Sequence, residues 1–86
     1  MASYERVFKQ SVAEDLRDIP KQDIERILQC IQALTDDARP AGGEKLSSQE
    51  RYRVRQGDYR IVYEIRDGRL IVLIVKVGHR RDVYRT

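Results

Sequence analysis

Apolar residues recur with a helical period in the first half of the chain. The clearest segment follows Pro20, where they fall three and four positions apart: Ile24, Ile27, Leu28, Ile31 and Leu34. This spacing predicts one apolar face of an amphipathic helix, with glutamines and charged residues on the opposite face. Pro20 can itself open that helix because its missing N–H has no partner in a first turn.

A shorter helix is predicted just before Pro20. Ser11 and Glu14 have the spacing of a capping box. Val12, Leu16 and Ile19 form an apolar stripe that is predicted to face the core. This helix ends before Pro20, because the residue preceding a proline is pushed out of the helical region. Upstream, Tyr4–Phe8 alternates weakly and predicts a short edge strand.

From Arg51 onward the period changes to two, which predicts three strands. Gly57-Asp58 and Asp67-Gly68 separate them. Both pairs suit two-residue hairpins, the first of type II′ because glycine leads and the second of type I′. The last strand, Leu70–Val77, is apolar at nearly every position, as in a central strand covered on both faces.

Loop length fixes the register of the first hairpin. A two-residue loop pairs Val54 with Ile61 and Tyr52 with Tyr63 on one face, and it pairs Arg55 with Arg60 and Arg53 with Val62 on the other. A three-residue loop would place Arg55 opposite Tyr59 and mix the faces. The pattern therefore favours the shorter loop and gathers arginines on one side of the sheet.

The element order β-α-α-β-β-β predicts an α+β fold. We expect a mostly antiparallel four-stranded sheet with two helices packed on one face and an arginine-lined surface on the other. The segment 78–86 is expected to fold back over part of that surface. With 86 residues, 41% of them hydrophobic and 36% charged, the chain is expected to form one domain, 1–86.

Composition favours a cytoplasmic protein. Cys30 is the single cysteine, so no disulfide can form within the chain, as is usual in a reducing compartment. The longest apolar runs fall far short of the roughly 20 residues that a membrane helix needs. We therefore expect no contact with a membrane.

Positive charge is concentrated in the second half of the chain. Residues 1–50 hold seven Lys and Arg against ten Asp and Glu, whereas residues 51–86 hold ten against four. Nine of those ten cations are arginines, which bind phosphate bidentately and keep their charge at any working pH. A polyanionic partner for this half is the expected consequence.

The predicted Arg55–Arg60 pair costs stability, because like charges directly across two strands repel. A bound phosphate would offset that repulsion, although two solvated surface arginines are an equally simple interpretation. The C-terminal residues could hold, stack on and cleave RNA: His79, Arg80, Arg81, Tyr84 and Arg85. His79 and Tyr84 could equally be structural.

Two blocks of sequence carry a resemblance to a known family. Residues 51–65, which include the run GDYRIVY, and residues 77–84, VGHRRDVY, resemble the RelE branch of the RelE/ParE toxin superfamily. The similarity spans essentially the whole chain. It implies a ribonuclease that enters the ribosomal A site and cleaves messenger RNA through the RNA's own 2′-hydroxyl, leaving a cyclic phosphate.

The resemblance also implies roles for individual residues. Arg60 and Arg80 match arginines that hold the phosphate, and Tyr84 matches a tyrosine that stacks on the codon. Arg53 and Arg55 match positions where the well-known form has lysines, and a guanidinium is a poor general base. His79 is then the first candidate for the base, and the alternatives are Glu64, expected on the same sheet face as Arg60, and positioning alone without a base. Further RNA contacts are expected from Arg51, Arg81 and Arg85.

Partners and alternatives follow from the same resemblance. A cognate antitoxin should hold the protein inactive and carry it indirectly to operator DNA, while the ribosome and its A-site messenger RNA are the targets. No cofactor or metal is expected. The alternatives are a ParE-like toxin that binds DNA gyrase and cleaves nothing, and a generic basic RNA-binding module.

Overall fold

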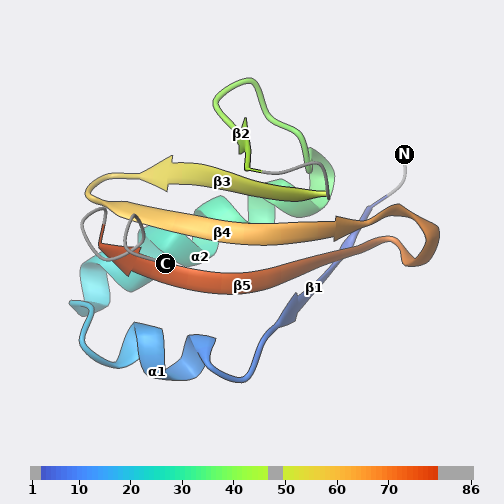
Figure 1. The fold of residues 1–86 in the computed structure, drawn as a ribbon. Coiled ribbons are helices and arrows are strands. Elements are labelled where there is room, and N and C mark those ends of the chain that lie inside the picture. Colours follow the sequence, from blue (N-terminus) through green and yellow to red (C-terminus); the bar gives the residue numbers. More distant parts are fainter. Residues whose placement is uncertain (1–2, 47–49, 80–86) are drawn as a thin grey trace.

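The computed structural model describes residues 3–46 and 50–79. Five strands form one sheet in the order β1-β5-β4-β3-β2, with α2 behind the sheet and α1 beside β5 (Figure 1). The elements in chain order are β1 (Glu5–Phe8), α1 (Val12–Arg17), α2 (Lys21–Asp36), β2 (Glu44–Lys45), β3 (Arg51–Gln56), β4 (Tyr59–Arg66), a 3₁₀ turn (Asp67–Arg69) and β5 (Ile71–His79). The α+β fold class is confirmed.

The sheet has one strand more than predicted. β2 has two residues, and it pairs antiparallel with β3 through Glu44 opposite Arg53 and Lys45 opposite Tyr52. A strand of this length is too short to show an alternation in the sequence. At the other edge, β1 is the predicted edge strand; all four of its residues are exposed, and it runs parallel to β5.

The first hairpin has the predicted register. Val54 lies opposite Ile61, Tyr52 opposite Tyr63, Arg53 opposite Val62 and Arg55 opposite Arg60. Gly57 has a φ of 60°, and the next residue, Asp58, has a negative φ, as in a type II′ turn. The two-residue loop is therefore confirmed, together with the face that each side chain takes.

The predicted type I′ turn at Asp67-Gly68 is wrong. Pairing of β4 with β5 ends at Arg66 opposite Ile71, so residues 67–70 form the loop, and its left-handed position is Leu70, at a φ of 53°. The Asp67 carboxylate accepts hydrogen bonds from the Tyr4 hydroxyl and from Arg39. These contacts with distant segments fix a turn that the local sequence does not specify.

α1 begins after Ser11, but the predicted capping box is absent because the Ser11 side chain makes no capping hydrogen bond. Val12 is buried, and Leu16 and Ile19 are partly buried against the core, as the stripe predicts. The Asp15 carboxylate accepts the backbone N–H of Val77 at 3.1 Å. α1 thus supplies a hydrogen-bond acceptor to the backbone of β5 beyond Ile74, the last residue that pairs with β1.

The core lies between the sheet and the helices. α2 contributes Ile27, Ile31 and Leu34, as its predicted apolar face requires. Tyr63 is fully buried; its hydroxyl donates to the Ala38 carbonyl at 2.8 Å, and its ring stacks on that of Tyr52 with centroids 5.8 Å apart. This hydrogen bond ties the loop after α2 to the middle of the sheet.

A β-bulge changes the phase of β5 near its centre. Val62 lies opposite Lys76 whereas Tyr63 lies opposite Ile74, so Val75 is an extra residue on β5. The residues directed to the core are therefore Val72, Ile74 and Val77. The strand is central, as predicted, but it is fully buried only on the helix side, since Ile71 and Leu73 on the other side are half-buried.

Candidate nucleic-acid interface

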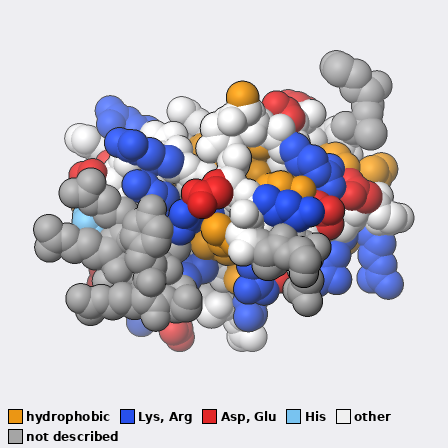
Figure 2. Space-filling model, turned by 45° about the horizontal axis from the view of Figure 1, so that its top comes forward, with side chains coloured by type: hydrophobic (Ala, Val, Ile, Leu, Met, Phe, Trp, Pro, Cys, Tyr) orange, Lys and Arg blue, Asp and Glu red, His pale blue; other side chains and the backbone are white. Residues whose placement is uncertain are grey.

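The sheet face turned away from the helices, here called the open face, carries most of the described basic residues of the second half of the chain. Alternation along the strands and the register place six basic side chains on it: Arg51, Arg53, Arg55, Arg60, Arg66 and Lys76. Glu64 lies on the same face. Figure 2 views this face obliquely and shows Lys and Arg side chains with carboxylates among them. The predicted arginine-lined surface is therefore present.

Arg55 and Arg60 form the last pair of that face before the Gly57 turn. Arg60 donates to the backbone carbonyls of Tyr59 at 3.1 Å and Gly57 at 3.4 Å. Arg55 is exposed and makes no hydrogen bond or ion pair with the residues that the structure describes. Two positive charges therefore face one another across a rigid hairpin, a suitable site for an anion.

Other arginines of the open face are bound to carboxylates. Arg53 donates to Glu44 at 2.7 Å, across the β2–β3 pair. Glu64 accepts hydrogen bonds from Arg51 and from Arg66, the latter at 2.8 Å. The hydrogen bond from Arg51 is the main reason that the pKa of Glu64 is lowered, so this carboxylate is a weak proton acceptor. This arrangement disfavours Glu64 as the general base.

His79 lies on the other side of the sheet. It is paired with Tyr59, whose ring packs against the core, and the two rings meet edge to face with centroids 6.0 Å apart. Both residues border a cleft of about 320 Å³ that is also lined by Asp15 of α1 and by Asp18, the residue after α1. The structure therefore does not bring His79 together with Arg60, and a base at His79 would have to act from the opposite face.

Several predicted site residues lie outside the described part of the chain. They are Arg80, Arg81, Tyr84 and Arg85. The expected return of segment 78–86 over the sheet also lies outside it from residue 80 onward. The described site thus consists of the strand residues alone.

Comparison with known proteins agrees with this architecture. A family model described as the ParE toxin of the type II toxin–antitoxin system, parDE, matches residues 7–84. The chain belongs to this toxin family. No match to a curated protein sequence reaches significance. The resemblance to the RelE/ParE superfamily found in the sequence is therefore confirmed.

Solved structures of RelE toxins share the fold of this toxin. The RelBE2 toxin–antitoxin complex of Mycobacterium tuberculosis is similar at 25% identity and a TM-score of 0.80, over 91% of this chain and 99% of that chain. The archaeal RelE–RelB complex of Pyrococcus horikoshii OT3 is similar at 24% identity and a TM-score of 0.78, over 91% and 96%. The isolated RelE toxin of E. coli follows at 20% identity and a TM-score of 0.80, over 96% and 93%.

Two features of the toxin were not singled out in the sequence. Lys76 reaches the open face only because of the bulge at Val75. Arg39 donates to Glu50 at 3.0 Å, to Asp67 at 2.9 Å and to the Tyr52 hydroxyl at 3.2 Å. This cluster joins three loops at the end of β4 remote from Arg60, which indicates a structural role for Arg39.

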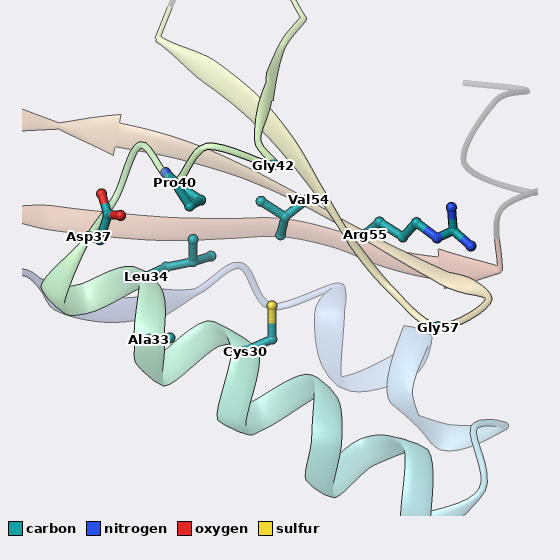
Figure 3. A pocket seen from close by; sticks show the side chains of 9 residues that line it. All are labelled: Cys30, Ala33, Leu34, Asp37, Pro40, Gly42, Val54, Arg55 and Gly57. Atoms are coloured by element: carbon teal, nitrogen blue, oxygen red, sulfur yellow. The ribbon is translucent and has the colours of Figure 1, made fainter.

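An apolar groove of about 540 Å³ separates α2 from β3 (Figure 3). Cys30 and Leu34 line it from the helix and Val54 from the strand, and burial raises the pKa of the Cys30 thiol. In Figure 3 the Arg55 side chain extends away from Cys30 and Leu34. Arg55 and Gly57 nevertheless border the groove, so the groove reaches one member of the cationic pair.

Among residues 3–46 and 50–79, no group of three or more His, Cys, Asp or Glu side chains is placed to hold a metal ion. No helix in that part of the chain is long and apolar enough to cross a membrane.

Proposed function

We propose that this toxin is an endoribonuclease of the RelE type that cleaves messenger RNA in the ribosomal A site and so inhibits translation. The observation that supports it best is the Arg55–Arg60 pair, two arginines on adjacent strands without a carboxylate among the described residues. A folded protein keeps such a pair at a cost, and an RNA phosphate is a ligand that offsets it.

The chemistry proposed is a transesterification within the RNA. The 2′-hydroxyl loses its proton and attacks the adjacent phosphorus, the bond from phosphorus to the 5′-oxygen breaks, and that oxygen gains a proton. Products are a cyclic phosphate and a 5′-hydroxyl. Arg60 and Arg55 stabilise the extra negative charge of the transition state, as fixed cations do in a preorganised site.

The remaining predicted residues complete this proposal. Arg80 binds the same phosphate as Arg60, and Tyr84 stacks on the codon. Arg53, Arg51, Arg81 and Arg85 contribute positive potential along the RNA. Because guanidinium groups do not release protons and Glu64 is bound by two arginines, positioning and charge stabilisation supply most of the rate, with His79 left as the base to be tested.

The proposal includes partners and location. A cognate antitoxin inhibits the single toxin domain, 1–86, in the cytoplasm, and the complex reaches operator DNA through the antitoxin. Similar toxins are found in solved toxin–antitoxin complexes, which supports the antitoxin as a partner. A free nuclease of this kind would arrest its own cell.

The second candidate is a ParE-like toxin that binds DNA gyrase. It is favoured by the family model, whose description names ParE and parDE. It needs no phosphate site on the sheet, so replacement of Arg60 by alanine should leave its toxicity intact.

Mapping of transcript ends separates the two functions. After induction of the wild-type toxin, new 5′-hydroxyl ends should appear inside translated frames, and they should be absent from an otherwise identical message without a start codon. Purified toxin should cut ribosome-bound messenger RNA and spare naked RNA. Growth arrest with intact messages and inhibited gyrase supercoiling would instead establish the ParE-like function.

A further inference from the structure

The cations of the open face divide into two groups by their partners. Arg51 and Arg66 share the carboxylate of Glu64, and Arg53 binds that of Glu44. Within residues 3–46 and 50–79, no carboxylate lies within 4.0 Å of Arg55, Arg60 or Lys76. Lys76 is also the single lysine among the ten cations of residues 51–86.

The three uncompensated cations lie at the same end of the sheet. Arg60 is opposite Arg55 on β3 and opposite Gly78 on β5, while Lys76 precedes Gly78 by two residues on the same face. Directly opposite residues lie about 5 Å apart and diagonal ones about 7 to 8 Å apart, so Lys76 is a diagonal neighbour of Arg60. Gly78 places bare backbone beside both cations.

The bulge is what gives Lys76 this position. Val77, the next residue, is buried in the core against the helices, so Lys76 must point to the open face. If the strand instead alternated regularly from Ile74 through Val75, Lys76 would point into the core. Bulges commonly re-aim a side chain beside a functional site, and a buried lysine without a partner would destabilise the fold.

We propose that Lys76 is a phosphate ligand of the RNA site and acts with Arg55 and Arg60 around the backbone of Gly78. The ligand is a phosphodiester of single-stranded RNA, so the inference rests on the proposed ribonuclease function. Lysine adds a mobile point charge to two planar guanidinium groups. Lys76 also borders the cleft beside α1, which Glu14, Asp15 and Asp18 line as well, and Asp15 accepts the Val77 N–H there.

Binding of a non-cleavable RNA tests this role without requiring cleavage. A fluorescent single-stranded RNA with 2′-O-methyl groups is titrated with wild type, Lys76→Ala, Lys76→Arg and the control Lys21→Ala at several salt concentrations. Lys21 lies in the first turn of α2 and is exposed. Lys76→Ala should bind about tenfold more weakly, as expected for one lost charge-assisted hydrogen bond.

Salt dependence and a second control show whether the loss of a phosphate contact causes the weaker binding of Lys76→Ala. The slope of log K against log salt should fall by about 0.7 in Lys76→Ala, the value for one phosphate contact on a single strand. Lys76→Arg should restore binding, and Lys21→Ala should match wild type. Arg66→Ala, which removes a cation bound to Glu64, should weaken binding less than Lys76→Ala.

The outcomes separate this inference from the proposed function. If wild type binds RNA and cleaves ribosome-bound message while Lys76→Ala binds equally well, Lys76 is not a ligand and the ribonuclease function stands. Equal losses in Lys76→Ala and Arg66→Ala would also overturn the inference. If wild type neither binds RNA nor cleaves message, the proposed function fails and the inference fails with it. Equal melting temperatures confirm that each variant is folded.

Discussion

Arg60→Ala is the variant that best separates function from folding in this toxin. Its effect on stability has two opposing parts. Relief of the repulsion from Arg55 should stabilise the fold by about 0.2 to 1 kcal/mol, as for other cross-strand pairs. Loss of the hydrogen bonds to the Tyr59 and Gly57 carbonyls, which are half-exposed and exposed, costs at most about 1 kcal/mol. The net change is close to zero.

For a domain of this size, 1 kcal/mol shifts the melting temperature by roughly 4 to 8 °C. Arg60→Ala should therefore melt within a few degrees of wild type. Arg55→Ala is the matched control, because Arg55 makes no bond to the described residues and loses only the repulsion. Its melting temperature should be equal to or slightly above that of wild type.

The effect on activity should be large. A hydrogen bond between a cation and a phosphate contributes about 1.5 to 3 kcal/mol, so the rate should fall by roughly 10- to 150-fold. The assay is cleavage of ribosome-bound messenger RNA by purified variants, with melting followed by circular dichroism. An Arg60→Ala variant that melts more than about 10 °C below wild type would refute the stability argument. A folded one that cleaves at the wild-type rate would refute the phosphate site.

Three further predictions concern the fold. Tyr63→Phe should lower the free energy of unfolding by about 1 to 3 kcal/mol in urea titrations, because the buried Ala38 carbonyl loses its donor. Ile27→Asp should abolish the cooperative transition, whereas Leu73→Asp, on the half-buried open face, should retain it. Because the pKa of Glu64 is lower in the folded protein than its value of about 4.3 in the unfolded chain, the ionised carboxylate stabilises the fold above that pH. This stabilisation is lost as the pH falls through the lowered pKa of the folded protein. The melting temperature of Glu64→Gln should therefore fall less than that of wild type as the pH is lowered from about 5 to 3.

The first hairpin could be predicted in detail because two independent local signals agree there. Gly57-Asp58 specifies a two-residue turn, and the alternation of arginine with Tyr52 and Val54 specifies the faces. A one-residue slip would bury arginines, so a single register satisfies both signals. The position of Arg60 opposite Arg55, which is the centre of the candidate site, follows from the same argument.

The bulge in β5 could not be predicted from sequence. Ile71–Val75 is apolar at every position, so a shift of phase inside this run leaves apolar side chains on both faces and changes no pattern. Its consequences fall on the residues after it. Lys76 moves to the open face, and His79 moves to the helix side, away from the arginines with which the sequence grouped it.

Tertiary contacts decide the other features that the sequence missed. β2 exists because the loop after α2 returns to β3, where Glu44 meets Arg53. The turn after β4 is held through Asp67 by Arg39, a residue 28 positions earlier in the chain. Propensity over a few residues contains no information on either contact.

Stability and function are expected to oppose one another at the cross-strand pair formed by Arg55 and Arg60. Glu44 and Glu64 supply carboxylates to the open face, but Glu44, the first residue of β2, lies opposite Arg53, and Glu64 lies four residues beyond Arg60. Neither carboxylate is therefore part of the Arg55–Arg60 pair. Arg55→Glu would place a carboxylate there. An opposite-charge pair should stabilise the hairpin by about 0.2 to 1 kcal/mol relative to a neutral one, and relief of the repulsion adds to this. The same carboxylate would repel phosphate and form an ion pair with Arg60, so cleavage should be lost while the melting temperature rises. A variant that instead gained stability and kept full cleavage would show that phosphate does not bind between these two strands.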